Sequence, residues 1–225
     1  MPTAIVTGAS RGLGLALSRA LSERGWRLVI DAREAGPLQA AAAQLPGATP
    51  IPGDVADPSH RRALVEAAGG RVDLLVNNAS LLGPSPQPAL ADYPLDVLER
   101  VYRVNVLAPL ALIQLALPLL GDDARIVNVT SDAAVEPYEG WGGYGSSKAA
   151  LDQLGAVLAV EEPGIRVYSV DPGDMSTRMQ QDAFPGEDIS DRSTPEERVP
   201  GLLALIEGDL PSGRYSAGAL LESRA

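Results

Sequence analysis

The sequence of 225 residues contains no cysteine and only one histidine. Without cysteine the chain forms no disulfide and no metal site with thiolate ligands, and we expect no bound metal. A chain without cysteine is compatible with the reducing cytoplasm, which is the location that we expect. The first residues, MPTAIVTGAS, lack the charged region of a signal peptide, which agrees with that expectation.

Basic residues are few, because 18 Lys and Arg stand against 29 Asp and Glu and give a formal net charge of -11. A surface of this sign repels nucleic-acid phosphates and anionic lipid headgroups. We therefore expect neither nucleic acid nor a membrane as a partner. The charge does not exclude one phosphorylated small molecule bound at a local site.

Long apolar runs are also missing. The longest, residues 106–120, contains two prolines and a glutamine and is shorter than a membrane span requires. We expect it to be part of a helix buried against other protein.

Strand and helix patterns alternate along the chain. The strands are continuously apolar, which is typical of a parallel sheet covered on both faces. No internal repeat or linker interrupts the pattern, so residues 1–225 are expected to form one α/β domain. Strands are predicted at 3–7, 26–33, 48–55, 71–80, 124–131, 165–173 and 213–220. Helices are predicted at 13–24, 36–45, 59–69, 95–120 with a bend near Pro109, 144–160 and 194–208.

A tyrosine and a lysine lie four residues apart in the segment WGGYGSSKAAL, residues 141–151. On the predicted helix Tyr144 and Lys148 share one face. An ammonium beside a phenol favours the phenolate, so we expect the pKa of Tyr144 to fall from ~10 towards neutrality. Such a phenol can serve as a general acid or base. An isolated pair with this spacing is also common on solvated helices, so the rest of the chain must decide.

A glycine-rich loop, TGASRGLG at residues 7–14, lies between the first strand and the first helix. Its spacing of Gly8, Gly12 and Gly14 differs from the G-x-G-x-x-G fingerprint. A tight turn that leads into a helix N-terminus is nevertheless suited to bind a pyrophosphate. The loop predicts a dinucleotide site, and a glycine turn without a ligand is the alternative.

The end of the second strand indicates which dinucleotide is bound. An acidic residue there would bind a ribose 2′-hydroxyl, whereas arginine accommodates a 2′-phosphate. Asp31 and Arg33 are both present, and Arg11 in the glycine loop adds a second cation. Alternate residues of a strand face opposite sides, so we expect Asp31 to point away from the ribose. The two arginines favour NADP(H) over NAD(H). A solvated Arg33 without a ligand is the alternative.

Together these segments resemble the short-chain dehydrogenase/reductase family. Seven motifs follow in the order of that family and cover nearly the whole chain up to Thr177. They are TGASRGLG, Asp54-Val55, NNAS at 77–80, Asn105, Ser131 thirteen residues before Tyr144, YGSSK, and DPGDMST at 171–177. Ser80 and Asp171 depart from the glycine and asparagine that the family commonly has.

The resemblance implies a single doubly wound Rossmann domain with a central parallel sheet of about seven strands flanked by helices. It also implies catalytic roles for four residues. Tyr144 would protonate the substrate carbonyl, and Lys148 would lower the pKa of Tyr144 and bind the nicotinamide ribose. Ser131 would polarise the carbonyl, and Asn105 would hold a water that relays protons. From the residue alone, Asn105 could equally be a buried core amide.

The cofactor contacts that the resemblance implies come from the same motifs. Thr177 could instead be a helix N-cap. The implied cofactor-binding residues are Gly8, Ser10, Arg11, Gly12, Leu13, Gly14, Arg33, Asp54, Val55, Asn78, Ala79, Tyr144, Lys148, Pro172, Gly173, Met175 and Thr177.

We therefore expect an oxidoreductase that transfers hydride between NADP(H) and a small carbonyl or alcohol. The alternatives are a 3-oxoacyl thioester reductase and a nonenzymatic nucleotide-sensing protein on the same fold. The substrate should contact residues 81–93, 132–141 and 174–198, with residues 174–200 as a mobile lid. Trp141 could line that pocket or be structural.

Two further expectations concern regions outside the motifs. The apolar helices 95–120 and 144–160 should pack against another copy in a homodimer or homotetramer. His60, on a predicted surface helix, is expected to lie away from every motif and to have no catalytic role.

Overall fold

The computed structural model describes residues 1–222, which contain a sheet of seven parallel strands. The strand order is β3-β2-β1-β4-β5-β6-β7, which confirms the expected doubly wound sheet. The strands are β1 (Thr3–Val6), β2 (Arg27–Ala32), β3 (Thr49–Pro52), β4 (Val72–Asn77), β5 (Leu120–Val129), β6 (Arg166–Asp171) and β7 (Gly213–Ser216).

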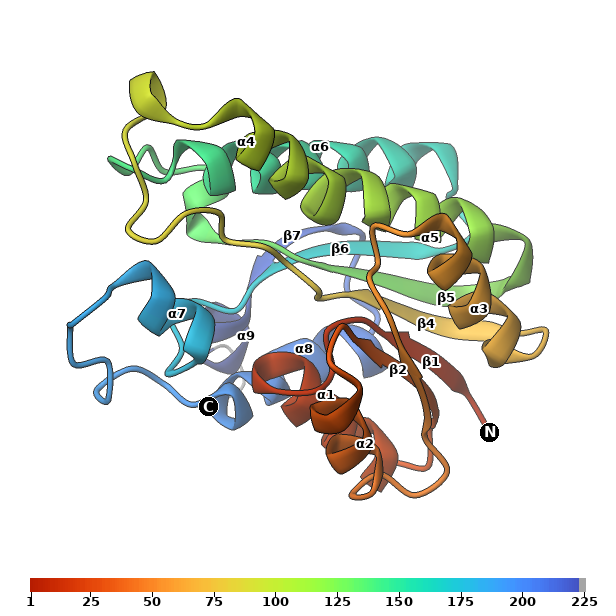
Figure 1. Cartoon of the computed structure of the whole chain (residues 1–225). Coiled ribbons are helices and arrows are strands. Elements are labelled where there is room, and N and C mark those ends of the chain that lie inside the picture. Colours follow the sequence, from red (N-terminus) through yellow and green to blue (C-terminus); the bar gives the residue numbers. More distant parts are fainter. Residues whose placement is uncertain (223–225) are drawn as a thin grey trace.

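Helices cover both faces of the sheet (Figure 1). One face carries α1 (Gly12–Glu23), α2 (Ala35–Ala42) and α8 (Pro195–Glu207), with α9 (Ala217–Glu222) packed against α8. The other face carries α3 (Pro58–Ala68), α4 (Leu95–Tyr102), α5 (Ala108–Ala116) and α6 (Gly142–Glu161). A short helix, α7 (Arg178–Ala183), lies beyond the end of β6.

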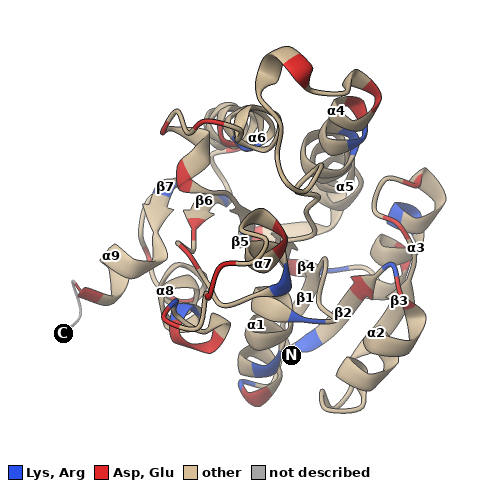
Figure 2. Ribbon diagram, turned by 60° about the vertical axis from the view of Figure 1, so that its left-hand side comes forward, with Lys and Arg blue, Asp and Glu red and all other residues tan. Residues whose placement is uncertain are grey.

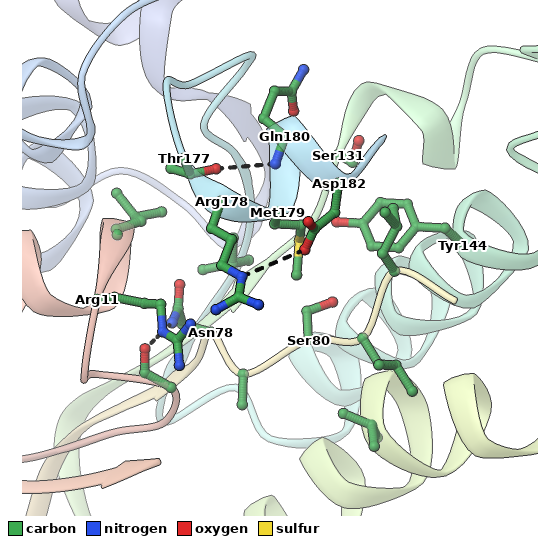
Figure 3. A pocket seen from close by; sticks show the side chains of 18 of the residues that line it. Arg11, Asn78, Ser80, Ser131, Tyr144, Thr177, Arg178, Met179, Gln180 and Asp182 are labelled. Atoms are coloured by element: carbon green, nitrogen blue, oxygen red, sulfur yellow. Dashed lines mark hydrogen bonds and ion pairs between the residues drawn. The ribbon is translucent and has the colours of Figure 1, made fainter. Parts of the chain in front are cut away.

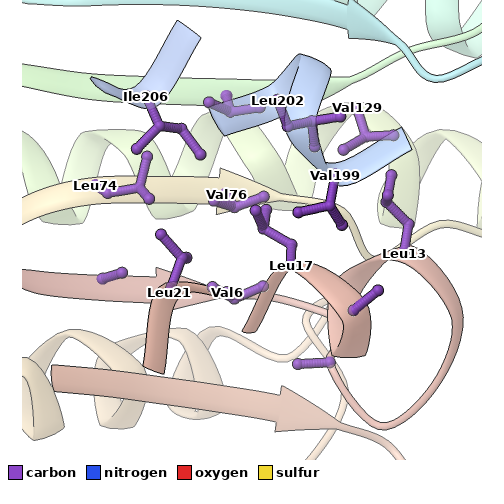
Figure 4. Packing of buried hydrophobic residues seen from close by; sticks show 14 of the residues in the cluster. Val6, Leu13, Leu17, Leu21, Leu74, Val76, Val129, Val199, Leu202 and Ile206 are labelled. Atoms are coloured by element: carbon purple, nitrogen blue, oxygen red, sulfur yellow. The ribbon is translucent and has the colours of Figure 1, made fainter. Parts of the chain in front are cut away.

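The core beneath α1 and α8 is built from aliphatic side chains (Figure 4). Leu17 and Leu21 of α1 are almost fully buried, and they meet Leu202 and Ile206 of α8 over Val76 of β4. Each buried side chain of this size stabilises the fold by roughly 1.5–3 kcal/mol. This packing fixes α1, and therefore the glycine loop before it, against the sheet.

The chain reverses its direction across the sheet between β1 and β4. From β1 it proceeds to β2 and β3 on one side, and from β4 it proceeds to β7 on the other. In such sheets ligands bind outside the carboxyl ends of the strands at this reversal. The loops after β1, β4, β5 and β6 therefore meet at one place.

The helical stretch Leu95–Leu119 is interrupted by a π-helical turn, Arg103–Leu107, just before Pro109. The whole stretch has the length and composition of a membrane-crossing helix, so the expectation based on residues 106–120 alone was too narrow. However, 44% of its most apolar window is buried, and Leu112 and Ile113 belong to the core beneath α3. One buried apolar face is typical of a helix that packs against the core of a protein.

The end of the chain differs from the sequence-based prediction. Residues 213–220 were expected to form one strand, but β7 ends at Ser216 and α9 begins at Ala217. Ala217 is completely buried against α8, where its carbonyl oxygen and Cα lie too close to Gly201 for that glycine to carry a side chain. The chain changes from strand to helix where Ala217 packs against α8, and this tertiary contact is not visible in the local sequence.

Candidate active site

A cavity of about 590 Å³ lies at the carboxyl ends of β1, β4, β5 and β6, which is within the size range of cofactor and ligand sites. Nearly all the predicted site residues line it. The two exceptions are Gly14 and Asn105, which lie behind its wall.

The glycine loop is held in a conformation that only glycine adopts readily. Gly8 and Gly12 have φ angles of 68° and 56°. A Cβ on Gly14 would lie 2.5 Å from the Gly8 carbonyl oxygen, so α1 can pack this closely only without a side chain there. Asn78 then secures the loop, because its Nδ2 donates to the carbonyl oxygens of Thr7 at 2.8 Å and Gly8 at 3.2 Å.

Asp31 is directed to the backbone of the glycine loop and to His60, which agrees with the expectation that it points away from a ribose. Its Oδ1 accepts a hydrogen bond from the Gly8 N–H at 2.6 Å, and its side chain is buried. Burial raises the pKa of Asp31 above its ordinary value, against the opposing effect of its hydrogen bonds from His60 and Gly8.

His60 corrects the expectation of a surface position away from the site. Its Nε2 lies 2.9 Å from Asp31 Oδ2, and the ring is only 7% exposed. The imidazole occupies the space above Gly53, where a Cβ would come within 2.3 Å of Nδ1. His60 therefore supports the glycine loop through Asp31. Helix periodicity could not reveal this contact because it depends on how α3 packs over β2.

Three charged residues gather where a 2′-phosphate is expected. Arg11, Arg33 and Glu34 all line the cavity and are exposed. Arg11 Nη2 lies 2.6 Å from Glu34 Oε1, so one of the two predicted cations is already paired. Glu34 was not among the predicted site residues, although its position directly after Arg33 was a usable signal.

Tyr144 and Lys148 lie one turn apart on α6 and are both buried, with Lys148 only 2% exposed. Lys148 Nζ donates to the Val129 carbonyl oxygen at 2.7 Å and lies 5.5 Å from the centre of the Tyr144 ring. Burial lowers the pKa of Lys148 to about 8, although Asp152 opposes this effect.

The expected fall in the pKa of Tyr144 was wrong for this structure. Burial raises the pKa of Tyr144 to about 12, and a hydrogen bond with Ser80 only partly opposes that effect. The ammonium of Lys148 lies over the ring face and is bonded to a carbonyl oxygen, so desolvation of the phenolate dominates. A phenol with a raised pKa keeps its proton at neutral pH. The protonated phenol is the form that can donate a proton to a carbonyl oxygen.

Ser131 lines the cavity at the end of β5. Its Oγ donates to Asp132 Oδ1 at 2.9 Å and accepts from the Ala133 N–H at 3.2 Å. The hydroxyl is therefore positioned by its own turn, next to a carboxylate that the sequence analysis did not consider.

Asn105 lies in the π-helical turn and is completely buried. Its side chain exchanges hydrogen bonds with the Leu81 backbone at 2.8 and 2.9 Å, and its Nδ2 also donates to Ser147 Oγ. Ser80 Oγ donates to Asn105 Oδ1 at 3.2 Å. The side chain thus joins the loop after β4 to α6, and the water relay stays a prediction.

The segment after β6 closes the cavity. Pro172, Gly173, Met175 and Thr177 line it. Thr177 is also the N-cap of α7, with its Oγ1 accepting from the Gln180 N–H at 3.3 Å. The N-cap alternative is therefore correct for this threonine, and its contact with a cofactor stays a prediction.

The two ends of the cavity differ in chemistry (Figure 3). Arg11 and Asn78 lie at one end, whereas Tyr144, Met179 and Asp182 gather at the other. Trp141 lines that second end, where it packs against Tyr144 with ring centres 5.9 Å apart. Both alternatives for Trp141 therefore describe this side chain, which lines the cavity and packs against neighbouring rings.

The cavity fits a nicotinamide dinucleotide. The close approach of Gly14 to Gly8 leaves the backbone at the start of α1 open to a pyrophosphate. Arg11 and Arg33 lie near the end of β2, where a ribose substituent would be bound. Within residues 1–222 no group of His, Asp or Glu side chains has the arrangement of a metal site.

Comparison with known proteins agrees with this geometry. A family model described as short chain dehydrogenase matches residues 2–188. The benzil reductase ((S)-benzoin forming) of Saccharomyces cerevisiae is 36% identical over 193 residues, covering 79% of this chain and 73% of that protein.

Two further comparisons show the breadth of the family. A rhamnolipids biosynthesis 3-oxoacyl-[acyl-carrier-protein] reductase of Pseudomonas aeruginosa is 38% identical over 191 residues, covering 78% of this chain and 73% of that protein. A short chain dehydrogenase of Escherichia coli CFT073, solved in complex with NADPH, has a TM-score of 0.87 and 28% identity, with 96% of both chains covered. The chain therefore belongs to the short chain dehydrogenase family of oxidoreductases.

Proposed function

We propose that this protein transfers hydride between NADP(H) and a small carbonyl or alcohol. The observation that carries the proposal is the buried Tyr144–Lys148 pair, which lines the same cavity as Ser131 and the glycine loop. When bound, the nicotinamide supplies or accepts the hydride.

The chain's own residues handle the proton and the carbonyl oxygen. In reduction Tyr144 donates the phenolic proton to the carbonyl oxygen as that oxygen gains negative charge. Ser131 donates a hydrogen bond to the same oxygen in place of its bond to Asp132. Lys148 provides an ammonium beneath Tyr144 and, when the cofactor is bound, a donor to its ribose. In oxidation the proton returns to Tyr144.

Preference for NADP(H) over NAD(H) is supported by Arg11 and Arg33 in the cavity wall and by the NADPH complex of the Escherichia coli relative. Direct binding of both cofactors to the wild type and to Arg33→Ala tests the preference. Arg33→Ala is expected to weaken NADPH binding and to leave NADH binding nearly unchanged. Equal effects on both cofactors would contradict the phosphate argument.

A 3-oxoacyl thioester is the second candidate substrate, favoured by the relative from Pseudomonas aeruginosa. An acidic carrier protein would, however, approach an acidic rim, because the segments in and around α7 carry several Asp and Glu residues (Figure 2). Comparing reduction of a 3-oxoacyl thioester with reduction of a panel of small ketones distinguishes the two candidates.

A nucleotide-sensing protein without catalytic activity is the third candidate function. It is disfavoured because Ser131, Tyr144 and Lys148 are all present and line one cavity. Oxidation of NADPH with the carbonyl panel tests catalysis, and Tyr144→Phe is the control. The variant is expected to lose reduction and to keep cofactor binding. Tight NADPH binding without turnover of any carbonyl would favour the sensor.

The proposal includes a homodimer or homotetramer and a moving lid. Leu107 and Leu115 of the α4–α5 stretch and Val157 and Val160 of α6 are large apolar side chains that remain exposed, and these helices lie side by side (Figure 1). Residues 174–200 include α7, which Ser85 Oγ tethers by donating to the Asp182 carbonyl oxygen at 2.6 Å. Slower backbone hydrogen exchange in this segment with NADPH bound is expected for a lid.

A further inference from the structure

The substrate end of the cavity has an apolar wall. Leu82, Met179 and Ala183 pack around Tyr144, and Trp141 joins the same cluster from the start of α6. Phe184 lies behind Trp141 with ring centres 5.8 Å apart, which fixes the orientation of the indole. Trp141 remains partly exposed and lines the cavity, so its ring is available to a ligand.

This wall is formed by three segments that are far apart in the sequence. Leu82 follows β4, Trp141 precedes α6, and Met179 and Ala183 belong to α7. An aromatic ring in contact with Trp141 would be favoured, because aromatic pairs attract one another beyond the area that they bury. A short aliphatic carbonyl compound would leave most of this wall uncovered.

The charges at the same end are predominantly negative. Asp132, Asp174 and Asp182 line the cavity there. Arg178 also lines the cavity, with its Nε 4.0 Å from Asp182 Oδ2, and Asp174 Oδ2 lies 3.9 Å from Arg192 Nε. An anionic substrate would therefore meet several carboxylates and a guanidinium that is already partnered, whereas a neutral substrate would meet no such repulsion.

We propose that the substrate class is an uncharged aryl ketone, whose ring lies against Trp141 while its carbonyl oxygen faces Tyr144 and Ser131. This inference rests on the proposed carbonyl reduction. The inference restricts the range of carbonyl substrates. The apolar wall favours a substrate with an aromatic ring, and the carboxylates disfavour a substrate with a negative charge.

The test uses ketones that differ in one feature. Methyl 4-acetylbenzoate is neutral, 4-acetylbenzoate carries an anion at the same position, and acetylcyclohexane replaces the aromatic ring by a saturated one. With NADPH as reductant, kcat/KM is expected to be at least tenfold higher for the neutral ester than for the acid. It should also be several-fold higher for acetophenone than for acetylcyclohexane. Equal rates for ester and acid, or a preference for the saturated ring, would overturn the inference.

Two variants assign the selectivity to the residues named. Trp141→Leu should lower kcat/KM for acetophenone about tenfold and change that for 2,3-butanedione less than threefold. Asp174→Asn combined with Asp182→Asn should raise the ratio of kcat/KM for 4-acetylbenzoate to kcat/KM for the ester at least threefold. Asp191→Asn is the matched control, because Asp191 is exposed on the same segment but does not line the cavity. The same gain in Asp191→Asn would overturn the charge argument.

A binding measurement separates this inference from the proposed catalysis. The chain has two tryptophans, so Trp26→Phe leaves Trp141 as the sole indole. Its fluorescence should be quenched by methyl 4-acetylbenzoate with a Kd at least tenfold lower than for 4-acetylbenzoate, with NADP+ bound. Selective quenching without turnover would overturn the proposed reaction and keep the substrate site. Turnover without selective quenching would overturn the site alone.

Discussion

Lys148 offers the most direct test of the site's electrostatics because it is the only lysine in the sequence. Burial lowers its pKa from 10.5 to about 8. At about 1.4 kcal/mol per pH unit, the protein disfavours the ammonium by about 3 kcal/mol relative to water. Asp152, one turn further along α6, acts in the opposite direction.

Asp152→Asn is therefore expected to lower the pKa of Lys148 further. Two unit charges 4 Å apart interact by about 1 kcal/mol in water and by more at the lower dielectric constant of a protein. Because Asp152 also pairs with Arg214 at 3.1 Å, part of its charge is already compensated. The expected change is a decrease of about half to one pH unit.

Selective isotope labelling of lysine gives one side-chain resonance, which can be followed by NMR from pH 6 to pH 11. Glu161→Gln is the matched control, because it removes one exposed acid from the end of the same helix. A pKa of 10 or above in the cofactor-free wild type would refute the burial argument. An unchanged or raised pKa in Asp152→Asn would refute the role of Asp152.

The pH dependence of reduction follows from the same values. Tyr144, with a pKa raised to about 12, holds its proton throughout the range from pH 6 to pH 10. The ammonium of Lys148 is present below about pH 8 and is lost as the pH rises through that value. We therefore expect kcat/KM for reduction to fall above about pH 8, with the fall shifted to lower pH in Asp152→Asn.

Three other substitutions test separate parts of the site and surface. Glu34→Gln removes the partner of Arg11 and should tighten NADPH binding about three- to tenfold with little effect on NADH. Glu99→Gln is the control, because the pair of Glu99 with Arg103 does not line the cavity. Equally tighter NADPH binding in Glu99→Gln would contradict the reasoning. Gly14→Ala places a methyl group 2.5 Å from the Gly8 carbonyl oxygen and should cost about 1–3 kcal/mol in thermal or urea unfolding. In contrast, Gly36→Ala in α2 meets no atom within 4 Å and should be neutral or stabilising. Val160→Glu, at a side chain 82% exposed, should reduce the mass measured by light scattering if α6 forms an interface between copies, and an unchanged oligomer would place the interface elsewhere.

Much of the fold and of the site could be predicted from the sequence because the signals are local. Continuous apolar strands alternating with helices indicate a covered parallel sheet. The spacing of Tyr144 and Lys148 places both on one face of a helix. The glycine loop and the segment DPGDMST at 171–177 carry their conformational requirements within a few residues. Nearly all the residues that these motifs predicted for the site line the cavity.

The tertiary structure decided what depends on burial and on contacts between distant segments. The pKa of Tyr144 rises because the fold removes the phenol from water, and helix spacing alone cannot report burial. His60 reaches Asp31 across 29 residues because α3 packs over β2. Arg11 and Glu34 meet across 23 residues, and Trp141 before α6 contacts Phe184 after α7. Sequence motifs thus determined the chemistry of the site, while packing determined its charge, its proton affinity and the shape of its substrate end.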